Sequence, residues 1–316
     1  MNAISDKIHR SWELFKHSVR VIQQHPKLLI FPIVTGIMTT AIALFFLAPV
    51  ALVLLAPHWI SGSHVQALAD PIGFMRSRPG ASFDLQIQPL GTAMLAGMYL
   101  LNMFLGTMAS VAFNHQIVEA LNGRPVSISR GIAAACSRWK SVLLWSFVAG
   151  VVGLIIRALE ERLAFVGRIV AGLIGLTWSV ASIFAIPILA REPTFSNPFA
   201  ILSKSAEIIK RTWGETLAGY AGMQGTNLLV FFMSLLFWAS AGFAAYLFSN
   251  AWLLLPAGVG WLLAIIAYGY LASLASRVYL CALYLYASEG VVPGHFEASM
   301  MNMGWKTKKG VPQING

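Results

Sequence analysis

The chain has 316 residues, of which 57% are hydrophobic and 11% are charged, and its mean hydropathy is +0.70. A soluble domain carries about 25% charged residues, so the composition excludes a soluble globular protein and indicates membrane spans joined by loops. The net charge of +10 then points to lipid headgroups and topology and away from nucleic acid. Cys136 and Cys281 are too far apart to indicate a disulfide framework or a zinc site.

Three basic stretches repeat one spacing pattern. In each of them apolar residues recur at alternating steps of three and four, which places them on one face of a helix. Lys and Arg occupy the opposite face. The apolar residues are Ile8, Trp12, Phe15, Val19 and Ile22, then Ile128, Ile132, Ala135, Trp139 and Val142, then Phe199, Leu202, Ala206, Ile209 and Trp213. The pattern predicts three amphipathic helices that lie flat in the membrane interface.

Each basic stretch leads into apolar segments long enough to cross a membrane. The predicted spans are residues 28–56, 91–113, 141–156, 169–189, 216–247 and 254–274. The first is longer than the ~20 residues that a span needs, so we expect it to tilt or to break near Pro49. Pro187 lies near the end of the fourth span, where a break costs little. Asn197 and Pro198 form a helix start, with an N-cap followed by proline at the first helical position.

The distribution of basic residues predicts the topology. With the N-terminus on the cytoplasmic side, seventeen of the 22 Lys and Arg residues fall in cytoplasmic segments and five fall in outer segments. Cytoplasmic segments of membrane proteins carry such an excess. We therefore expect both termini and all three amphipathic helices on the cytoplasmic face.

The spans and amphipathic helices combine into an all-α polytopic membrane protein with about six transmembrane helices. We expect three units, each an interfacial amphipathic helix followed by a two-span hairpin, at about residues 1–113, 122–189 and 197–287. They form a single membrane domain, 1–287, and residues 288–316 form a cytoplasmic tail. Because each unit has an even number of spans, the internal repeat is parallel, as in some transporters.

Several segments resemble a known family. They are SWELFKHSVRVI and PKLLIFPI near the start, GRIVAGLIGLTWSVASIFAIPIL in the middle, then KRTWGE and ALYLYASEGVVPGHF. Together they resemble uncharacterised prokaryotic multi-pass membrane proteins, a domain of unknown function. That domain is similar in plan to the membrane domain of some glycerophosphodiester phosphodiesterases. The resemblance implies a location in the bacterial inner membrane, but no functional residues, because none are assigned in the family.

Residues that could carry chemistry are few. His115 and Glu119 are four apart, as metal ligands or a proton-exchanging pair would be, although an interfacial His beside a solvated Glu is the simpler explanation. His58, His64 and Asp70 match no metal motif, and no motif of a hydrolase, metalloprotease or phosphate-binding loop occurs. We therefore predict no catalytic residue, no metal and no cofactor.

Asn102, Gln224 and Asn227 are the polar residues set within the second and fifth spans. Polar groups at that depth usually face the bundle and form hydrogen bonds across helices. We therefore expect them to serve packing, and a polar pathway is the alternative.

Three functions from different classes fit this sequence. We favour a non-enzymatic integral membrane protein that organises or senses the membrane, or that assists other membrane proteins. A transporter or channel with a polar path near Asn102, Gln224 and Asn227 is the alternative, and a lipid-acting enzyme at the cytoplasmic face is the second alternative. The expected partners are membrane lipids, above all anionic headgroups, and other membrane proteins, but not nucleic acid. The residues expected to contact headgroups are Lys16, Arg20, Arg130, Arg138, Lys140, Lys204, Lys210 and Arg211.

Overall fold

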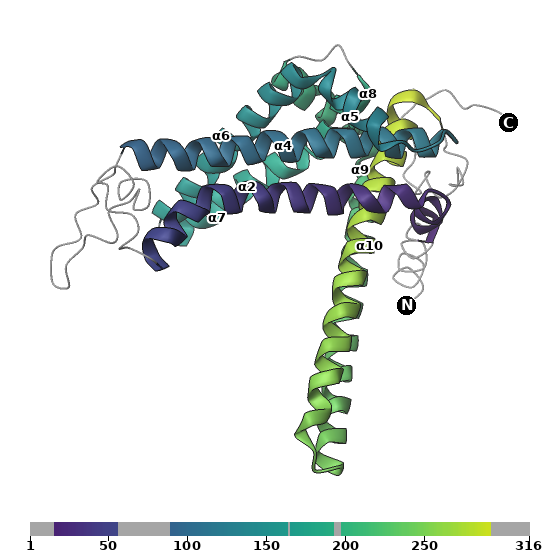
Figure 1. The fold of residues 1–316 in the computed structure, drawn as a ribbon. Coiled ribbons are helices and arrows are strands. Elements are labelled where there is room, and N and C mark those ends of the chain that lie inside the picture. The colour runs from purple at the N-terminus through teal and green to yellow at the C-terminus, as the bar shows by residue number, and fades with distance from the viewer. Residues whose placement is uncertain (1–15, 56–88, 164, 193–196, 292–316) are drawn as a thin grey trace. The chain divides into compact units, whose positions relative to one another are not determined.

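The computed structural model describes residues 16–55, 89–163, 165–192 and 197–291, without the side chains of 46–55, 89–95, 165–166, 211–229 and 253. Within these ranges the regular structure is helical throughout (Figure 1). Residues 16–24 are helical, and the helices that follow are η1 (Pro26–Leu29), α2 (Ile30–Leu55), α4 (Pro89–Leu121), α5 (Ile128–Cys136), α6 (Trp139–Arg162), α7 (Phe165–Ala181), α8 (Ala185–Arg191), α9 (Pro198–Leu247), η4 (Ala251–Leu253) and α10 (Leu254–Glu289).

Six described helical segments are long and apolar enough to cross a membrane. They are Pro26–Phe45, Ala96–Leu121, Trp139–Arg162, Gly167–Arg191, Val230–Leu247 and Leu254–Glu289. Each overlaps one of the six predicted spans, so the predicted all-α polytopic fold is confirmed. Length and apolarity are properties of a local stretch of sequence, which is why they could be read without knowledge of any tertiary contact.

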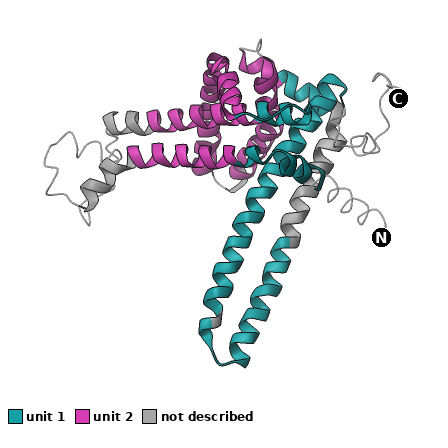
Figure 2. Cartoon of the chain, turned by 45° about the vertical axis from the view of Figure 1, so that its right-hand side comes forward, with its two compact units in different colours: residues 1–29, 114–127, 203–316 teal, residues 30–113, 128–202 magenta. Residues whose placement is uncertain are grey.

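The chain divides into two compact units (Figure 2). Unit 1 comprises residues 1–29, 114–127 and 203–316, and unit 2 comprises residues 30–113 and 128–202. The boundaries cross α4 after Phe113 and α9 after Leu202, so each of these helices contributes to both units. The division into three repeated sequence units stays a prediction.

Pro49 and Pro187 affect their helices differently from each other. A break near Pro49 is absent, because α2 runs from Ile30 to Leu55 as one helix, and the alternative, a tilt of this span, stays a prediction. Local adjustments and neighbouring groups make proline tolerable in membrane helices. Near Pro187, α7 ends at Ala181 and α8 begins at Ala185. A proline ring clashes with the carbonyl four residues earlier, here that of Ile183. The helix is interrupted there, and Pro187 falls in the first turn of α8.

The start of α9 agrees with the prediction, but the predicted separation of an interfacial helix from the span does not. Asn197 caps the helix, since its Oδ1 accepts a hydrogen bond from the Phe199 backbone N–H at 2.9 Å. The helix then continues for 50 residues to Leu247, so it contains no separate interfacial helix before the span. The sequence between Pro198 and Leu247 holds glycines but no further proline, and isolated glycines weaken a helix without breaking it. By contrast, residues 137–138 separate α5 from α6.

Side-chain burial is concentrated at one end of each long helix. In α4 the described side chains of residues 96–106 are all at least partly exposed, whereas those of residues 111–121 are mostly buried. The buried residues of α6 end at Gly150, and those of α10 begin at Leu274. These buried ends are the ones that the count of basic residues assigns to the cytoplasm. The opposite halves expose large apolar side chains, which lipid tails can solvate as well as another helix can.

A glycine ends α4 and starts the turn to α5. Gly123 has a φ of +71°, and its N–H donates to the Ala120 carbonyl at 3.0 Å. The Arg124 N–H donates to the Glu119 carbonyl at 2.9 Å. These two hydrogen bonds form a Schellman motif, which satisfies carbonyls that the helix end would leave free. The chain therefore turns directly after the end of α4.

Replacing Gly123 by Ala should lower the free energy of unfolding by about 1 kcal/mol, because an L-residue pays roughly that amount in the left-handed region. A Cβ at this position would have open space, with nothing within 4 Å, so the backbone alone causes the loss. Gly97→Ala is the matched control, since Gly97 also has open space and lies within α4. Thermal unfolding in detergent should distinguish the two variants, and equal melting temperatures would contradict the prediction.

Candidate functional site

Most of the basic residues predicted to contact headgroups lie at the surface. Lys204 and Arg138 are half-buried, and Arg211 lies in the part of α9 whose side chains are not described. The exposed residues are Lys16, Arg20, Arg130, Lys140 and Lys210.

Large apolar side chains are exposed on the same helices as these basic residues. Ile132 and Trp139 are 49% and 48% exposed, and Phe199 is 72% exposed. All three belong to the apolar faces predicted from the sequence, and the Lys140 Nζ lies 5.8 Å from the centre of the Trp139 ring. An exposed apolar side chain next to an exposed cation is the arrangement that suits a membrane interface.

The faces of α5 and α9 that pack inward are offset from the predicted apolar faces. The buried residues of α5 are Gly131 and Ala135, and only Ala135 belongs to the predicted face. In the first turns of α9 the chain buries Ile201, Ser205, Ile208 and Ile209, and only Ile209 belongs to it. The inward faces therefore include small or polar residues, such as Gly131 and Ser205, that a pattern of hydrophobicity does not single out.

Arg138, one of the predicted headgroup contacts, has a partner within the protein. It lies in the turn between α5 and α6, and its Nη1 donates to the Ala190 carbonyl in α8 at 2.7 Å. Its Nε is buried and has no hydrogen-bond partner. Burial and, after it, the positive charge of Arg191 lower the pKa of the Arg138 guanidinium from its ordinary value. Arginine nevertheless remains protonated in proteins, so a half-buried positive charge lies at this turn.

A buried polar contact in unit 1 was not predicted. The Cys281 thiol of α10 donates to the Asn114 Oδ1 of α4 at 3.0 Å, and both residues are buried. Nearby in sequence, the buried Gln116 accepts a hydrogen bond at its Oε1 from the Ser127 backbone N–H at 2.7 Å. These contacts hold the end of α4 to α10 and to the chain segment that precedes α5. The only sign of these contacts in the sequence is that the polar residues Asn114 and Gln116 stand at the end of an apolar span.

His115 and Glu119 each have partners from nearby residues. Glu119 forms a salt bridge with Arg124, in which Nη1 lies 3.1 Å from Oε1. The His115 Nδ1 lies 3.2 Å from the Gln116 Nε2. No group of three or more His, Cys, Asp or Glu side chains suited to a metal ion occurs within the described residues. His58, His64 and Asp70 lie outside them.

The structure describes the side chain of only one of the three predicted intramembrane polar residues. The Asn102 Nδ2 donates to the Met98 carbonyl in its own helix at 3.1 Å. Thr107, Ser146 and Ser234 bond in the same way to the carbonyl four residues earlier, which satisfies polar groups within the helix. Gln224 and Asn227 lie in the part of α9 without described side chains, so the predicted polar path around the three residues stays a prediction.

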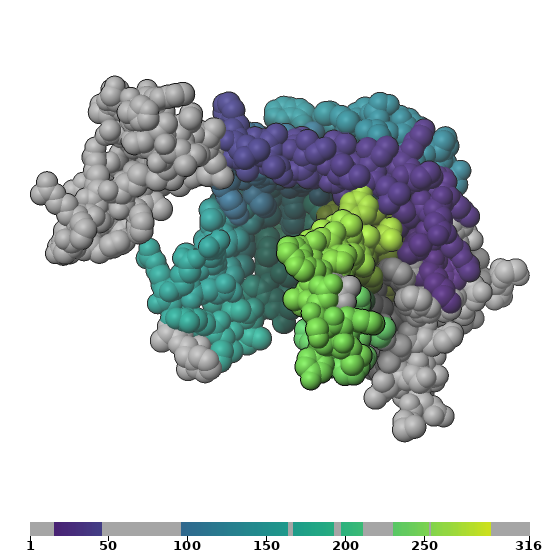
Figure 3. Space-filling view, turned by 60° about the horizontal axis from the view of Figure 1, so that its bottom comes forward, coloured from purple at the N-terminus to yellow at the C-terminus, as the bar shows by residue number. Residues whose placement is uncertain are grey.

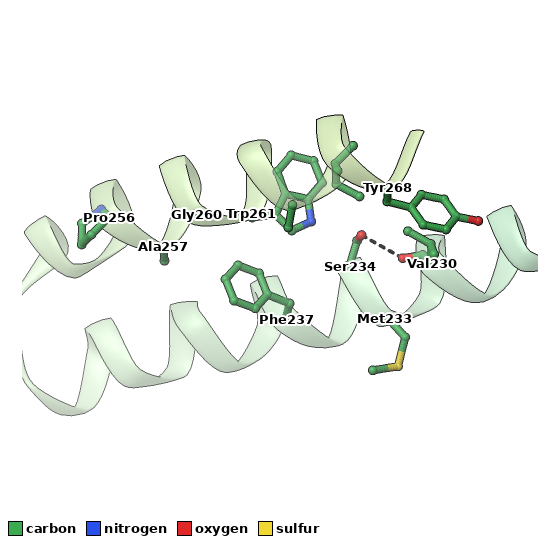
Figure 4. Close-up of a pocket in the computed structure, with 11 residues that line it drawn as sticks. Val230, Met233, Ser234, Phe237, Pro256, Ala257, Gly260, Trp261 and Tyr268 are labelled. Atoms are coloured by element: carbon green, nitrogen blue, oxygen red, sulfur yellow. Dashed lines mark hydrogen bonds between the residues drawn. The ribbon is translucent and has the colours of Figure 1, made fainter. Parts of the chain in front are cut away.

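A groove of about 420 Å³ lies between α9 and α10 within unit 1 (Figure 4). Phe237, Pro256, Trp261 and Tyr268 are among its lining residues, and Ser234 forms its hydrogen bond to Val230 beside it. Figure 3 shows α9 and α10 from the end at which the chain turns from one helix to the other. The described residues that line it include no carboxylate, imidazole or amine, so they offer no acid–base pair for catalysis.

The six apolar helices place the chain in the class of all-α polytopic membrane proteins. Residues 90–294 match the model of a family of unknown function (DUF6159), so the chain belongs to this family. The predicted membership of a domain of unknown function is thereby confirmed. No curated protein and no solved structure matches the chain. The likeness to the membrane domain of glycerophosphodiester phosphodiesterases stays a prediction.

Proposed function

We propose that this protein is a non-enzymatic integral protein of the bacterial inner membrane that organises the membrane, or assists other membrane proteins, through contacts with anionic lipid. Its basic helices lie on the cytoplasmic face and both termini are cytoplasmic. The observation that carries the proposal is the exposure of Ile132, Trp139 and Phe199 among exposed basic residues. Such a surface can insert apolar groups at the level of the acyl chains while its cations contact phosphates.

The pattern of burial supports the same function. The described halves of the spans opposite the basic ends expose apolar side chains, such as Leu263 at 63% and Leu236 at 66%. These surfaces suit lipid tails or the apolar helices of other membrane proteins. The protein would thus contact the bilayer at two levels, with headgroups at its basic end and acyl chains along its spans.

Neutralising the exposed basic residues should remove most of a preference for anionic lipid. Near an anionic surface each Lys or Arg contributes about 1 kcal/mol. The variant carries Gln at Lys16, Arg20, Arg130, Lys140 and Lys210. We expect wild-type protein, extracted with its surrounding lipid into polymer-bounded discs, to be enriched in phosphatidylglycerol over phosphatidylethanolamine, and the variant to be close to the bulk ratio.

Arg162→Gln together with Arg168→Gln is the control, because these exposed residues lie on the predicted outer side. The control variant should keep the enrichment of the wild type. Equal enrichment in all three proteins would mean that the cytoplasmic cations do not select lipid, and would refute the proposed function.

A further inference from the structure

The turn between α5 and α6 combines several groups that attract an anion. The Arg138 guanidinium is held against α8 by its hydrogen bond to the Ala190 carbonyl at 2.7 Å. Because Arg191 follows Ala190 directly, the Arg138 side chain reaches the backbone beside Arg191 at this contact. The like charge of Arg191 acts on Arg138. Two like charges that act on each other raise the electrostatic free energy, and an anion bound near them would lower it.

The start of α6 adds to the same positive field. Arg138 is the N-cap residue of α6, and no side chain caps the helix. The first N–H groups of an α-helix have no partner within the helix, and the positive end of its dipole lies there. The exposed Lys140 follows in the first turn. Backbone N–H groups at a helix start together with arginine are the groups with which proteins bind phosphate.

These groups lie at the boundary of the apolar spans. One span begins at Trp139, directly after Arg138, and another ends at Arg191. Since α6 and α7 form a hairpin, the start of the first span and the end of the second belong to the same membrane face. Trp139, which is 48% exposed, is a side chain that sits well at headgroup level. A phosphate at this position could therefore belong to a lipid.

We propose that Arg138 and Arg191, with the N-terminus of α6, form a specific phosphate-binding site whose ligand is the headgroup phosphate of an anionic phospholipid. This rests on the proposed function and deepens it, because it assigns one defined site in place of general attraction to the surface. Arg138 is fixed by α8 and so presents its guanidinium with little loss of conformational entropy, which favours a single geometry over a diffuse contact.

The test measures binding of short-chain phosphatidylglycerol to the full chain, freed of lipid in a neutral detergent, by native mass spectrometry. Losing one charge-assisted contact should weaken binding about tenfold in Arg138→Gln and in Arg191→Gln. Arg130→Gln is the comparison variant: it removes the same charge from exposed α5, where the proposed function expects diffuse attraction only, so it should weaken binding clearly less than the other two variants do. Short-chain diacylglycerol, which lacks the phosphate, should bind no more tightly to wild type than to the variants.

Inorganic phosphate separates the two possible sources of the ligand. If it displaces phosphatidylglycerol and its own binding falls in Arg138→Gln, the site is supported and accepts phosphate without the lipid. If it does not compete while the two variants weaken lipid binding, the site is supported as a lipid site. Equal weakening in the three variants, or equal binding of diacylglycerol, would overturn the site. The first of these outcomes would leave the proposed function standing, since diffuse attraction predicts it.

Arg138→Gln also removes the hydrogen bond to Ala190, so its folding must be checked by thermal unfolding in the same detergent. If it does not fold, Arg191→Gln carries the test alone, because the side chain of Arg191 takes no part in that hydrogen bond. Unchanged lipid binding in a folded Arg191→Gln variant would overturn the proposal.

Discussion

Cys136 is expected to remain unmodified when intact cells are treated with a membrane-impermeant thiol reagent, and to react readily once the membrane is opened. The chain contains two cysteines. Cys136 is exposed at the end of α5, whereas Cys281 is buried, with its thiol bonded to Asn114. The labelling signal of the folded protein therefore reports on Cys136. The side of the membrane on which Cys136 lies is also the side of α5. Because successive spans cross the membrane in opposite directions, it also gives the side of both termini.

Three variants make the experiment decisive. Cys136→Ser should abolish labelling in opened membranes, and Cys281→Ser should leave it unchanged. Arg162→Cys, made in the Cys136→Ser protein, places a thiol at the exposed end of α6, which the topology assigns to the outer side. That thiol should react in intact cells. Efficient labelling of Cys136 in intact cells would invert the topology and place the basic helices outside, where the excess of Lys and Arg would have no explanation.

The positions of the spans could be predicted because a span is defined by its own length and apolarity. The start of α9 at Pro198 was visible because a capping residue stands directly before it, whereas the start of α6 at Trp139 fell inside the predicted amphipathic helix. The turn at Gly123 was also readable, since few residues other than glycine adopt its backbone conformation. Each of these features depends on a few neighbouring residues.

The features that escaped prediction depend on residues distant in the sequence. The hydrogen bond from Arg138 to Ala190 and the contact between Cys281 and Asn114 join segments that no local pattern relates. Hydrophobic spacing also did not reveal the inward face of α5, because its buried residues are the small Gly131 and Ala135, and such a pattern does not single out Gly131. A phosphate site at Arg138 could therefore not be distinguished from a general basic surface.

Replacing Gly150 by Leu is expected to lower the free energy of unfolding by about 1–3 kcal/mol, the usual cost of overpacking a tight contact. Gly150 is buried in α6, where α4 approaches closely. A Cβ at this position would lie 3.3 Å from the Tyr99 Cε1 and 3.7 Å from the Met103 Cγ. The larger Leu side chain would force the two helices apart. It would also disrupt the hydrogen bond that the Tyr99 hydroxyl donates to the Gly150 carbonyl at 3.2 Å.

Gly172→Leu is the matched control, because Gly172 is an exposed residue of α7, and a Cβ added there would have nothing within 4 Å. It adds the same apolar side chain on a lipid-facing surface and should change stability little. Tyr99→Phe separates packing from hydrogen bonding: it keeps the ring and should cost only about 0.6 kcal/mol, the average for such a bond between membrane helices. Reversible unfolding in mixed micelles measures all three. If Gly150→Leu were no less stable than Gly172→Leu, α4 and α6 would not be in close contact at Gly150, and the packing of unit 2 around Tyr99 would be wrong.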